Sequence, residues 1–134
     1  MAEENGKSPP NGPEAVLRKY LERGNAKAVR GEWREAIEDY SEGLQCFDDS
    51  GLGLQDLTPE GCNALLTIFL YQGVCWEELE ETDKAIANYT EALERFKSSG
   101  LGLRDLTPDG RNSLLTIFLY QGMCWRKLEE TDKA

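Results

Sequence analysis

Residues 58–73 read TPEGCNALLTIFLYQG and residues 107–122 read TPDGRNSLLTIFLYQG, so the chain repeats itself. The two stretches belong to a longer duplication, because residues 50–85 align with residues 99–134 without a gap and differ at seven of 36 positions. The shift between the copies is 49 residues. A period of this length is typical of solenoid proteins, whose units bury their apolar faces against one another. We therefore expect a stack of similar units.

A more divergent copy precedes these two. The same shift places residues 33–51 on residues 82–100, so that Tyr40 matches Tyr89. One glycine recurs in the first half of all three copies, as Gly24, Gly73 and Gly122. The chain thus contains about two and three-quarter copies of one unit. The small glycine is expected to let a second helix cross the first closely, and the tyrosines to fill the space between units.

Each unit is expected to form two helices. Thr58-Pro59-Glu60 has the features of a helix start: a hydroxyl for the N-cap, a proline at the first helical position and an acid in the first turn. The first helix then runs to about Leu79, and Thr82 is the expected cap of the next. An apolar stripe at helical spacing marks that second helix at Ala85, Ile86, Tyr89, Ala92, Leu93 and Phe96. A buried strand over Leu65–Tyr71 is the alternative, which these helix signals disfavour.

The first copy carries a recognisable pattern. Residues 20–26 read YLERGNA and residues 31–44 read GEWREAIEDYSEGL. An aromatic and a glycine on a first helix, a glycine–aromatic turn, and alanine, an aromatic and leucine on a second helix resemble the tetratricopeptide repeat (TPR) family over about residues 13–134. The unit is longer than the family's usual length of about 34 residues. The proline common at the end of the family's second helix is replaced by Asp48 and Lys97.

The resemblance implies an all-α fold, a right-handed α-solenoid of antiparallel helix pairs. The repeat domain would span residues 13–134, with units at about 13–57, 58–106 and 107–134, the last of them incomplete. Residues 1–12, rich in proline, glycine, asparagine and glutamate, are expected to form a flexible N-terminal tail.

The resemblance also implies a function. TPR proteins generally bind extended or helical peptides on the concave face made by the first helices of the units. We therefore expect a protein–protein interaction scaffold that binds a peptide or partner protein, with no catalytic residues. Carried over by motif alignment, the predicted concave face comprises Arg18, Glu22, Asn25, Thr67, Tyr71, Val74, Glu77, Glu78, Thr116, Tyr120, Met123, Arg126 and Lys127. Only Asn25 matches the positions with which one TPR subset clamps a C-terminal carboxylate, so no such clamp is expected.

Composition disfavours several other functions. The net charge is −10, with 25 acidic and 15 basic residues, and such a surface repels nucleic acid and anionic membranes. No run of 18 apolar residues is present, and the polar, acidic start is unlike a secretory signal. A cytoplasmic location is therefore expected, with Cys46, Cys62, Cys75 and Cys124 as free thiols.

No metal, cofactor or active site is expected. The chain has no histidine, which removes the commonest general base and the commonest metal ligand. The acids at 77, 78, 80, 81 and 83 lack the spacing of a calcium loop and are interpreted as a solvated helix end. Cys75 and Cys124, each followed by tryptophan, are interpreted as small core residues.

Two observations leave alternatives open. Glu77 and Glu78 become Arg126 and Lys127 in the next copy, either by drift on a solvated face or to set the register with a neighbouring unit or partner. The apolar first helix of the third unit has no second helix to cover it. We therefore expect either a fragment of a longer array or an open end that pairs with another molecule. A self-assembling structural module, or a regulatory segment of a larger multidomain protein, are the alternative functions.

Overall fold

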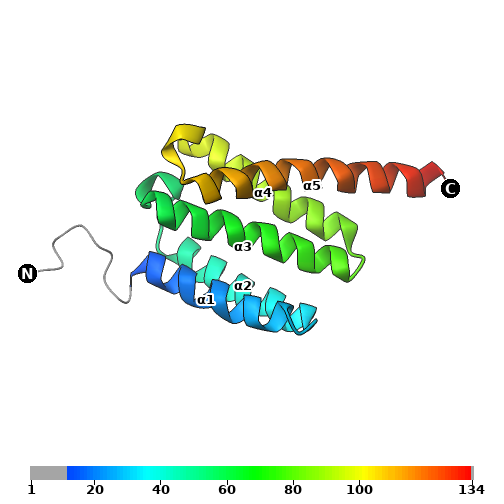
Figure 1. Cartoon of the computed structure of the whole chain (residues 1–134), viewed down its shortest axis with the longest axis horizontal. Helices are drawn as coiled ribbons and strands as arrows, with labels where there is room; N and C mark the ends of the chain where they lie inside the picture. Colours follow the sequence, from blue (N-terminus) through cyan, green and yellow to red (C-terminus); the bar gives the residue numbers. More distant parts are fainter. Residues whose placement is uncertain (1–11, 134) are drawn as a thin grey trace, which may run out of the picture.

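The computed structural model describes residues 12–133, which form five α-helices, two short 3₁₀ helices and no strand (Figure 1). The elements in chain order are α1 (Pro13–Ala28), α2 (Trp33–Asp49), η2 (Leu54–Asp56), α3 (Pro59–Glu78), α4 (Thr82–Ser99), η3 (Leu103–Asp105) and α5 (Pro108–Lys133). The all-α prediction is confirmed, and Leu65–Tyr71 lies inside α3 rather than in a strand. The predicted tail over residues 1–11 lies outside the described residues, and Gly12 occupies the N-cap position of α1.

The threonine–proline helix starts are confirmed. The Thr58 hydroxyl accepts a hydrogen bond from the Gly61 amide at 3.1 Å, and the Thr107 hydroxyl accepts one from the Gly110 amide at 2.9 Å. The prediction that Thr82 caps the next helix is wrong. Glu81 holds the N-cap position of α4, where its carbonyl accepts the first helical bond, and Thr82 is already helical.

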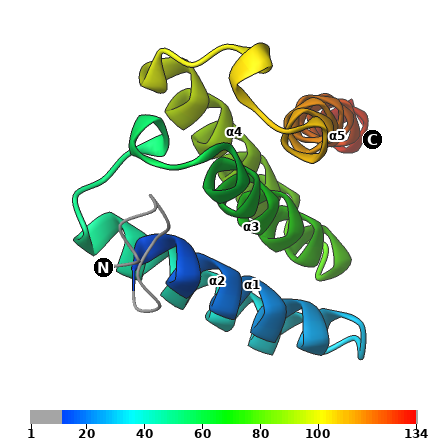
Figure 2. The same ribbon diagram turned by 60° about the vertical axis from the view of Figure 1, so that its left-hand side comes forward.

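The helices lie as two pairs and a single helix. α1 and α2 run in opposite directions, as do α3 and α4, and α5 lies beside both α3 and α4 (Figure 2). α3 also contacts α1 and α2. Each first helix therefore packs on both helices of the preceding pair, which is how one unit covers the apolar face of the next.

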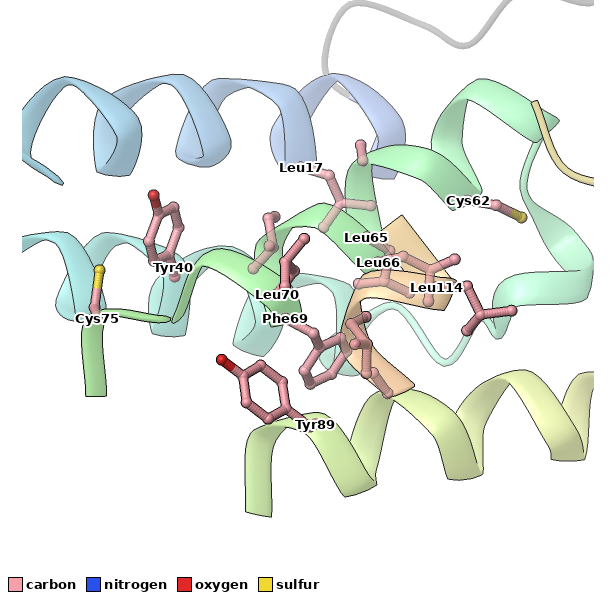
Figure 3. Packing of buried hydrophobic residues seen from close by; sticks show 14 of the residues in the cluster. Leu17, Tyr40, Cys62, Leu65, Leu66, Phe69, Leu70, Cys75, Tyr89 and Leu114 are labelled. Carbon is pink, nitrogen blue, oxygen red and sulfur yellow. The ribbon is translucent and has the colours of Figure 1, made fainter. Parts of the chain in front are cut away.

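The core is centred on α3, the helix with neighbours on several sides. Leu65, Leu66 and Ile68 of α3 are fully buried, and Figure 3 shows the α3 side chains between Leu17 of α1 and Tyr89 of α4. One polar side chain crosses this core. Gln72 donates to the Ile37 carbonyl at 3.1 Å and to the Ser41 hydroxyl at 2.8 Å, and it accepts a 2.7 Å bond from Asn88. Its buried polar atoms are thereby satisfied.

Tyrosine rings pack against the first two of the three repeated glycines. A Cβ added to Gly24 would meet the Tyr40 ring at 2.2 Å, and one added to Gly73 would meet the Tyr89 ring at 2.3 Å. We call this gap above the glycine the glycine notch. We expected the tyrosines to fill the space between units. That expectation was incomplete, because each ring also fills the notch of its own unit. Tyr89 then also reaches the next unit, with its ring centroid 6.2 Å from that of Tyr120.

One sequence adopts two structures. Residues 79–84 and residues 128–133 both read LEETDK. The first copy turns the chain between α3 and α4 with Glu80 at φ 60°, whereas the second continues α5 without a break. The expected turn of the third unit is therefore not formed, and Ala134, its expected first core residue, lies outside the described residues. Burial of α4 against α3 offsets the strained Glu80 in the first copy, whereas residues 12–133 contain no helix after α5 that could do so in the second.

Candidate functional site

An apolar groove opens where the first pair meets α3. Its volume is about 340 Å³, and we call it the Tyr71 groove. Its walls come from the end of α1, the turn after it, the first half of α2 and the second half of α3. The lining residues are Asn25, Ala28, Val29, Trp33, Tyr40, Tyr71, Val74 and Cys75. A depression of this kind, mostly apolar with a few polar groups, is the usual form of a ligand-binding site.

Two polar side chains are held in fixed positions in the Tyr71 groove. Tyr40 fills the notch at Gly24 and donates its hydroxyl proton to Asn25 Oδ1 at 2.6 Å. Burial raises the pKa of Tyr40, so the phenol stays neutral and remains a donor. Since Asn25 uses its oxygen in this bond, its amide nitrogen is the group that can donate to a ligand.

A buried ion pair fixes the wall formed by α1 and α2. The Asp39 carboxylate of α2 lies 2.7 Å from Lys27 Nζ and 3.4 Å from a guanidinium nitrogen of Arg23, both on α1. Asp39 is buried, so its charge requires these partners. The pair therefore holds the two helices in register at the end where the Tyr71 groove opens.

The three buried cysteines, Cys62, Cys75 and Cys124, contribute volume rather than reactivity. Burial, with a further contribution from Glu78, raises the pKa of Cys75 to about 11. Burial also raises the pKa of Cys62 and of Cys124 to about 11. Thiols with such pKa values are protonated near neutral pH and are poor nucleophiles. Cys75 and Cys124 are buried, as the interpretation as core residues requires.

Three of the residues predicted for the concave face meet in the Tyr71 groove. Asn25 comes from α1, whereas Tyr71 and Val74 come from α3, so the groove spans two units. Arg18 and Glu22 are exposed on α1 but do not line it.

Two other predicted face residues of the second unit, Thr67 and Glu77, make packing contacts, whereas Glu78 does not. The Thr67 hydroxyl lies 3.1 Å from that of Ser113 on α5. Glu77 accepts a 2.5 Å bond from the Tyr89 hydroxyl, and Glu78 beside it is exposed.

The third unit does not form an equivalent cluster from its predicted face residues. Tyr120 is half-buried against the Tyr89 ring, and Thr116 is half-buried as well. Met123, Arg126 and Lys127 are exposed on α5. The thirteen predicted positions therefore form one three-residue cluster at the first junction and a scattered set elsewhere.

Sequence reasoning missed part of this groove. Val29 lies in the turn after α1 with 84% of its surface exposed, and Trp33 begins α2 behind it. Val29 precedes Gly31, whose φ of 77° places it in the left-handed region of a tight turn. An apolar residue in a turn of this kind was the available signal. Trp33 was assigned only to the glycine–aromatic turn of the repeat pattern.

Comparisons with models of protein families, with curated proteins and with solved structures find no match to this chain. None of the helices within residues 12–133 is long and apolar enough to cross a membrane. Within the same residues, the cysteine, aspartate and glutamate side chains do not gather in threes at metal-binding distances.

Proposed function

We propose that this chain is a protein-interaction module that binds a short segment of a partner protein in the Tyr71 groove and carries out no chemistry of its own. The observation that carries the proposal is the convergence of Asn25, Tyr71 and Val74, from two units, on one apolar groove of about 340 Å³. Tyr71 is 40% exposed, so its ring is accessible to a bound segment, and tyrosine is a residue type enriched among the residues that dominate binding at interfaces.

We further propose that the helix pairs stack as a right-handed α-solenoid of the TPR kind. The support is the 49-residue period, the glycine and tyrosine that meet in each of the first two units, and the packing of each first helix on the preceding pair. In such a stack the junction between two units is the natural place for a ligand, because side chains from both units surround it.

The groove specifies the chemistry of its ligand. Its lining is mostly apolar, so the bound segment would insert one or two apolar or aromatic side chains beside Tyr71 and Val74. The Asn25 amide would donate to a backbone carbonyl of that segment. The tyrosine hydroxyls and the Asn25 amide would fix its orientation, while burial of the apolar side chains would supply most of the affinity.

A peptide-display selection on the intact chain tests this proposal. The selected peptide would be titrated into the unmodified chain and into variants by fluorescence anisotropy. Tyr71→Ala should weaken binding at least tenfold, because it removes the exposed ring of the groove. Leu52→Ala, which truncates a similarly exposed apolar side chain in the loop after α2, is the matched control and should leave the affinity within about twofold. Equal binding by both variants would refute the proposed site.

A further inference from the structure

The two long walls of the Tyr71 groove are equivalent helices and can be compared position by position. α1 and α3 lie side by side and run in the same direction (Figure 1). The 49-residue shift that relates them places Glu22 on Tyr71 and Val29 on Glu78. At each end of the groove, an apolar or aromatic lining residue on one wall therefore corresponds to a glutamate on the other wall.

Both glutamates lie next to lining residues of the groove. Glu22 stands three residues before Asn25 on α1, and Glu78 stands four residues after Val74 on α3. These spacings bring side chains to one face of a helix. Besides burial, the charge of Glu78 raises the pKa of Cys75, so this carboxylate lies close to a residue that lines the groove. Both glutamates are exposed and accessible to a ligand.

The cations nearest the groove already have acidic partners. The Asp39 carboxylate lies 2.7 Å from Lys27 Nζ and 3.4 Å from a guanidinium nitrogen of Arg23. Arg30, in the turn after α1, donates to the two oxygens of Glu32 at 3.1 and 3.2 Å. These three cations are therefore neutralised within the first helix pair.

The two glutamates lack such partners. Among residues 12–133, none forms an ion pair with Glu22 or Glu78. Two other cations lie farther from the groove. Arg18 is one turn beyond Glu22 as seen from Asn25, and Lys127 on α5 lines a separate depression together with other acids. With a net charge of −10 on the chain, the rim of the groove is negative.

The second junction is less suited to an apolar ligand. The shift of 49 residues replaces Ala28 and Val29, which line the Tyr71 groove, by Glu77 and Glu78. Glu77 accepts a hydrogen bond from the Tyr89 hydroxyl. Acids thus stand at the second junction where apolar residues line the first, so a large apolar side chain fits the first junction better.

The groove is complete without the third unit. All of its lining residues belong to α1, α2, the turn between these helices, and α3. Each of these helices has its partner, because α4 packs on α3. The groove is therefore open for reasons that do not depend on α5.

We propose that the Tyr71 groove selects a basic segment of a partner protein, in which a large apolar side chain is flanked on both sides by lysine or arginine. The apolar side chain would lie against Tyr71 and Val74, one flanking cation would pair with Glu22, and the other would pair with Glu78. This inference rests on the proposed function, because it names the chemistry of the segment that the same groove binds.

Two matched libraries of displayed peptides test the charge preference on the full chain. Both have a central phenylalanine, leucine or tryptophan, which is flanked by lysines in one library and by glutamates in the other. The best lysine-flanked peptide is then compared with its glutamate-flanked version by fluorescence anisotropy. The lysine form should bind about five- to tenfold more tightly, because two exposed pairs change from attraction to repulsion. This preference should shrink at about 1 M salt, which screens exposed charges.

Charge reversal in the chain provides the matched control. The double variant Glu22→Lys/Glu78→Lys should reverse the order of the two peptides. Glu42→Lys/Glu94→Lys makes the same change of net charge on exposed positions of α2 and α4 and should leave the order unchanged. An unchanged order in the first variant, or a reversed order in the second, would overturn the assignment of the two glutamates.

Tyr71→Ala separates failure of this inference from failure of the proposed function. If Tyr71→Ala weakens binding but the lysine and glutamate peptides bind equally, the groove binds a segment and the charge preference is wrong. If neither library yields a binder, or if Tyr71→Ala binds as tightly as the unmodified chain, the proposed function fails and this inference fails with it. Sedimentation that shows a dimer dissociated by Tyr71→Ala would place a second copy in the groove and would also contradict the inference.

Discussion

Gly24, Gly73 and Gly122 occupy the same position in three successive units, and their surroundings differ. Tyrosine rings lie against the first two, and the third is open. The equivalence of the three glycines could be read from the sequence, because the 49-residue shift superimposes them. The residues that pack against these glycines could not be read from the sequence, since the length of the repeat does not say whether a tyrosine points into its own unit or toward the next.

A matched pair of alanine substitutions tests the notch. Gly73→Ala should lower the free energy of unfolding by about 1–2 kcal/mol, because overpacking against the buried Tyr89 ring outweighs the helix propensity that alanine gains. Gly122→Ala should raise it by up to about 1 kcal/mol, since only the propensity term acts there. Urea denaturation of the two variants measures both values. Destabilisation of equal size at the two positions would show that contact with the Tyr89 ring does not determine the effect of an added Cβ.

Alkaline pH should destabilise the fold through its buried thiols and phenols. Burial raises the pKa of Cys62, Cys75 and Cys124 to about 11, and burial also raises the pKa values of Tyr40 and Tyr89. The folded chain then keeps protons that the unfolded chain, whose thiols have an ordinary pKa of 9.0, releases. Stability is therefore complete below pH 9 and is lost as the pH rises toward 11.

The urea midpoint at pH 7 and at pH 10.5 measures this effect, with a lower midpoint expected at pH 10.5. A Cys75→Ala variant should lose less between the two pH values than the unmodified chain, because it has one thiol fewer to ionise. A midpoint that stays constant over this range would contradict the assignment of these groups to the core.

At the scale of elements, the two copies of LEETDK show which helix boundaries can be predicted from adjacent residues and which cannot. The helix starts at Thr58 and Thr107, and the end of α4 at Gly100 with φ 79°, were predictable because each depends on a few adjacent residues. The two conformations of LEETDK were not predictable from its sequence, because the turn forms only where a second helix packs against the first. The grouping of the predicted site residues was also beyond the sequence, since motif alignment finds positions on a helix and does not say which of them a neighbouring helix covers.

Glycine substitutions in the two copies of this sequence test that explanation. Glu80→Gly should raise the free energy of unfolding by about 0.5–1 kcal/mol, because glycine adopts φ 60° without strain. Glu129→Gly lies within helix α5, so it should give no gain and should reduce the helical circular dichroism signal slightly. A gain from Glu129→Gly equal to that from Glu80→Gly would mean that both copies form the turn.

One carboxylate, that of Glu14, links α1 to the N-terminus of α3 by hydrogen bonds. Glu14 is buried, and its two oxygens accept from the Thr58 amide at 2.6 Å and the Thr58 hydroxyl at 2.8 Å, at the N-terminus of α3. Glu14→Gln should lower the free energy of unfolding by about 1–3 kcal/mol, because a donor replaces one acceptor and the favourable charge at the helix N-terminus is lost. Glu35→Gln, an exposed acid in the first turn of α2, should change it by less than about 0.5 kcal/mol in the same denaturation assay.

At the scale of the whole molecule, the described stack has two unlike ends. The α1 end exposes charged side chains, and the α5 end exposes leucines, a phenylalanine and a tryptophan. α3 lies between them and contacts all four other α-helices. Burial of large apolar side chains stabilises by about 1.5–3 kcal/mol each, so covering α5 is worth several times the energy of any single polar contact. Within residues 12–133, the α5 end is therefore the part of the stack that would gain most from being covered.

The most direct test of this account is amide hydrogen exchange, measured by NMR, over one nonapeptide in two places. Residues 65–73 and 114–122 both read LLTIFLYQG. From Leu66 and Leu115 onward the amides therefore have the same neighbours and the same intrinsic exchange rates, so only packing can separate the two stretches. The account predicts that the amides of residues 65–73, enclosed by four helices, exchange markedly more slowly than those of residues 114–122, which are covered on one side. Equal protection of the two stretches, or stronger protection of residues 114–122, would contradict it.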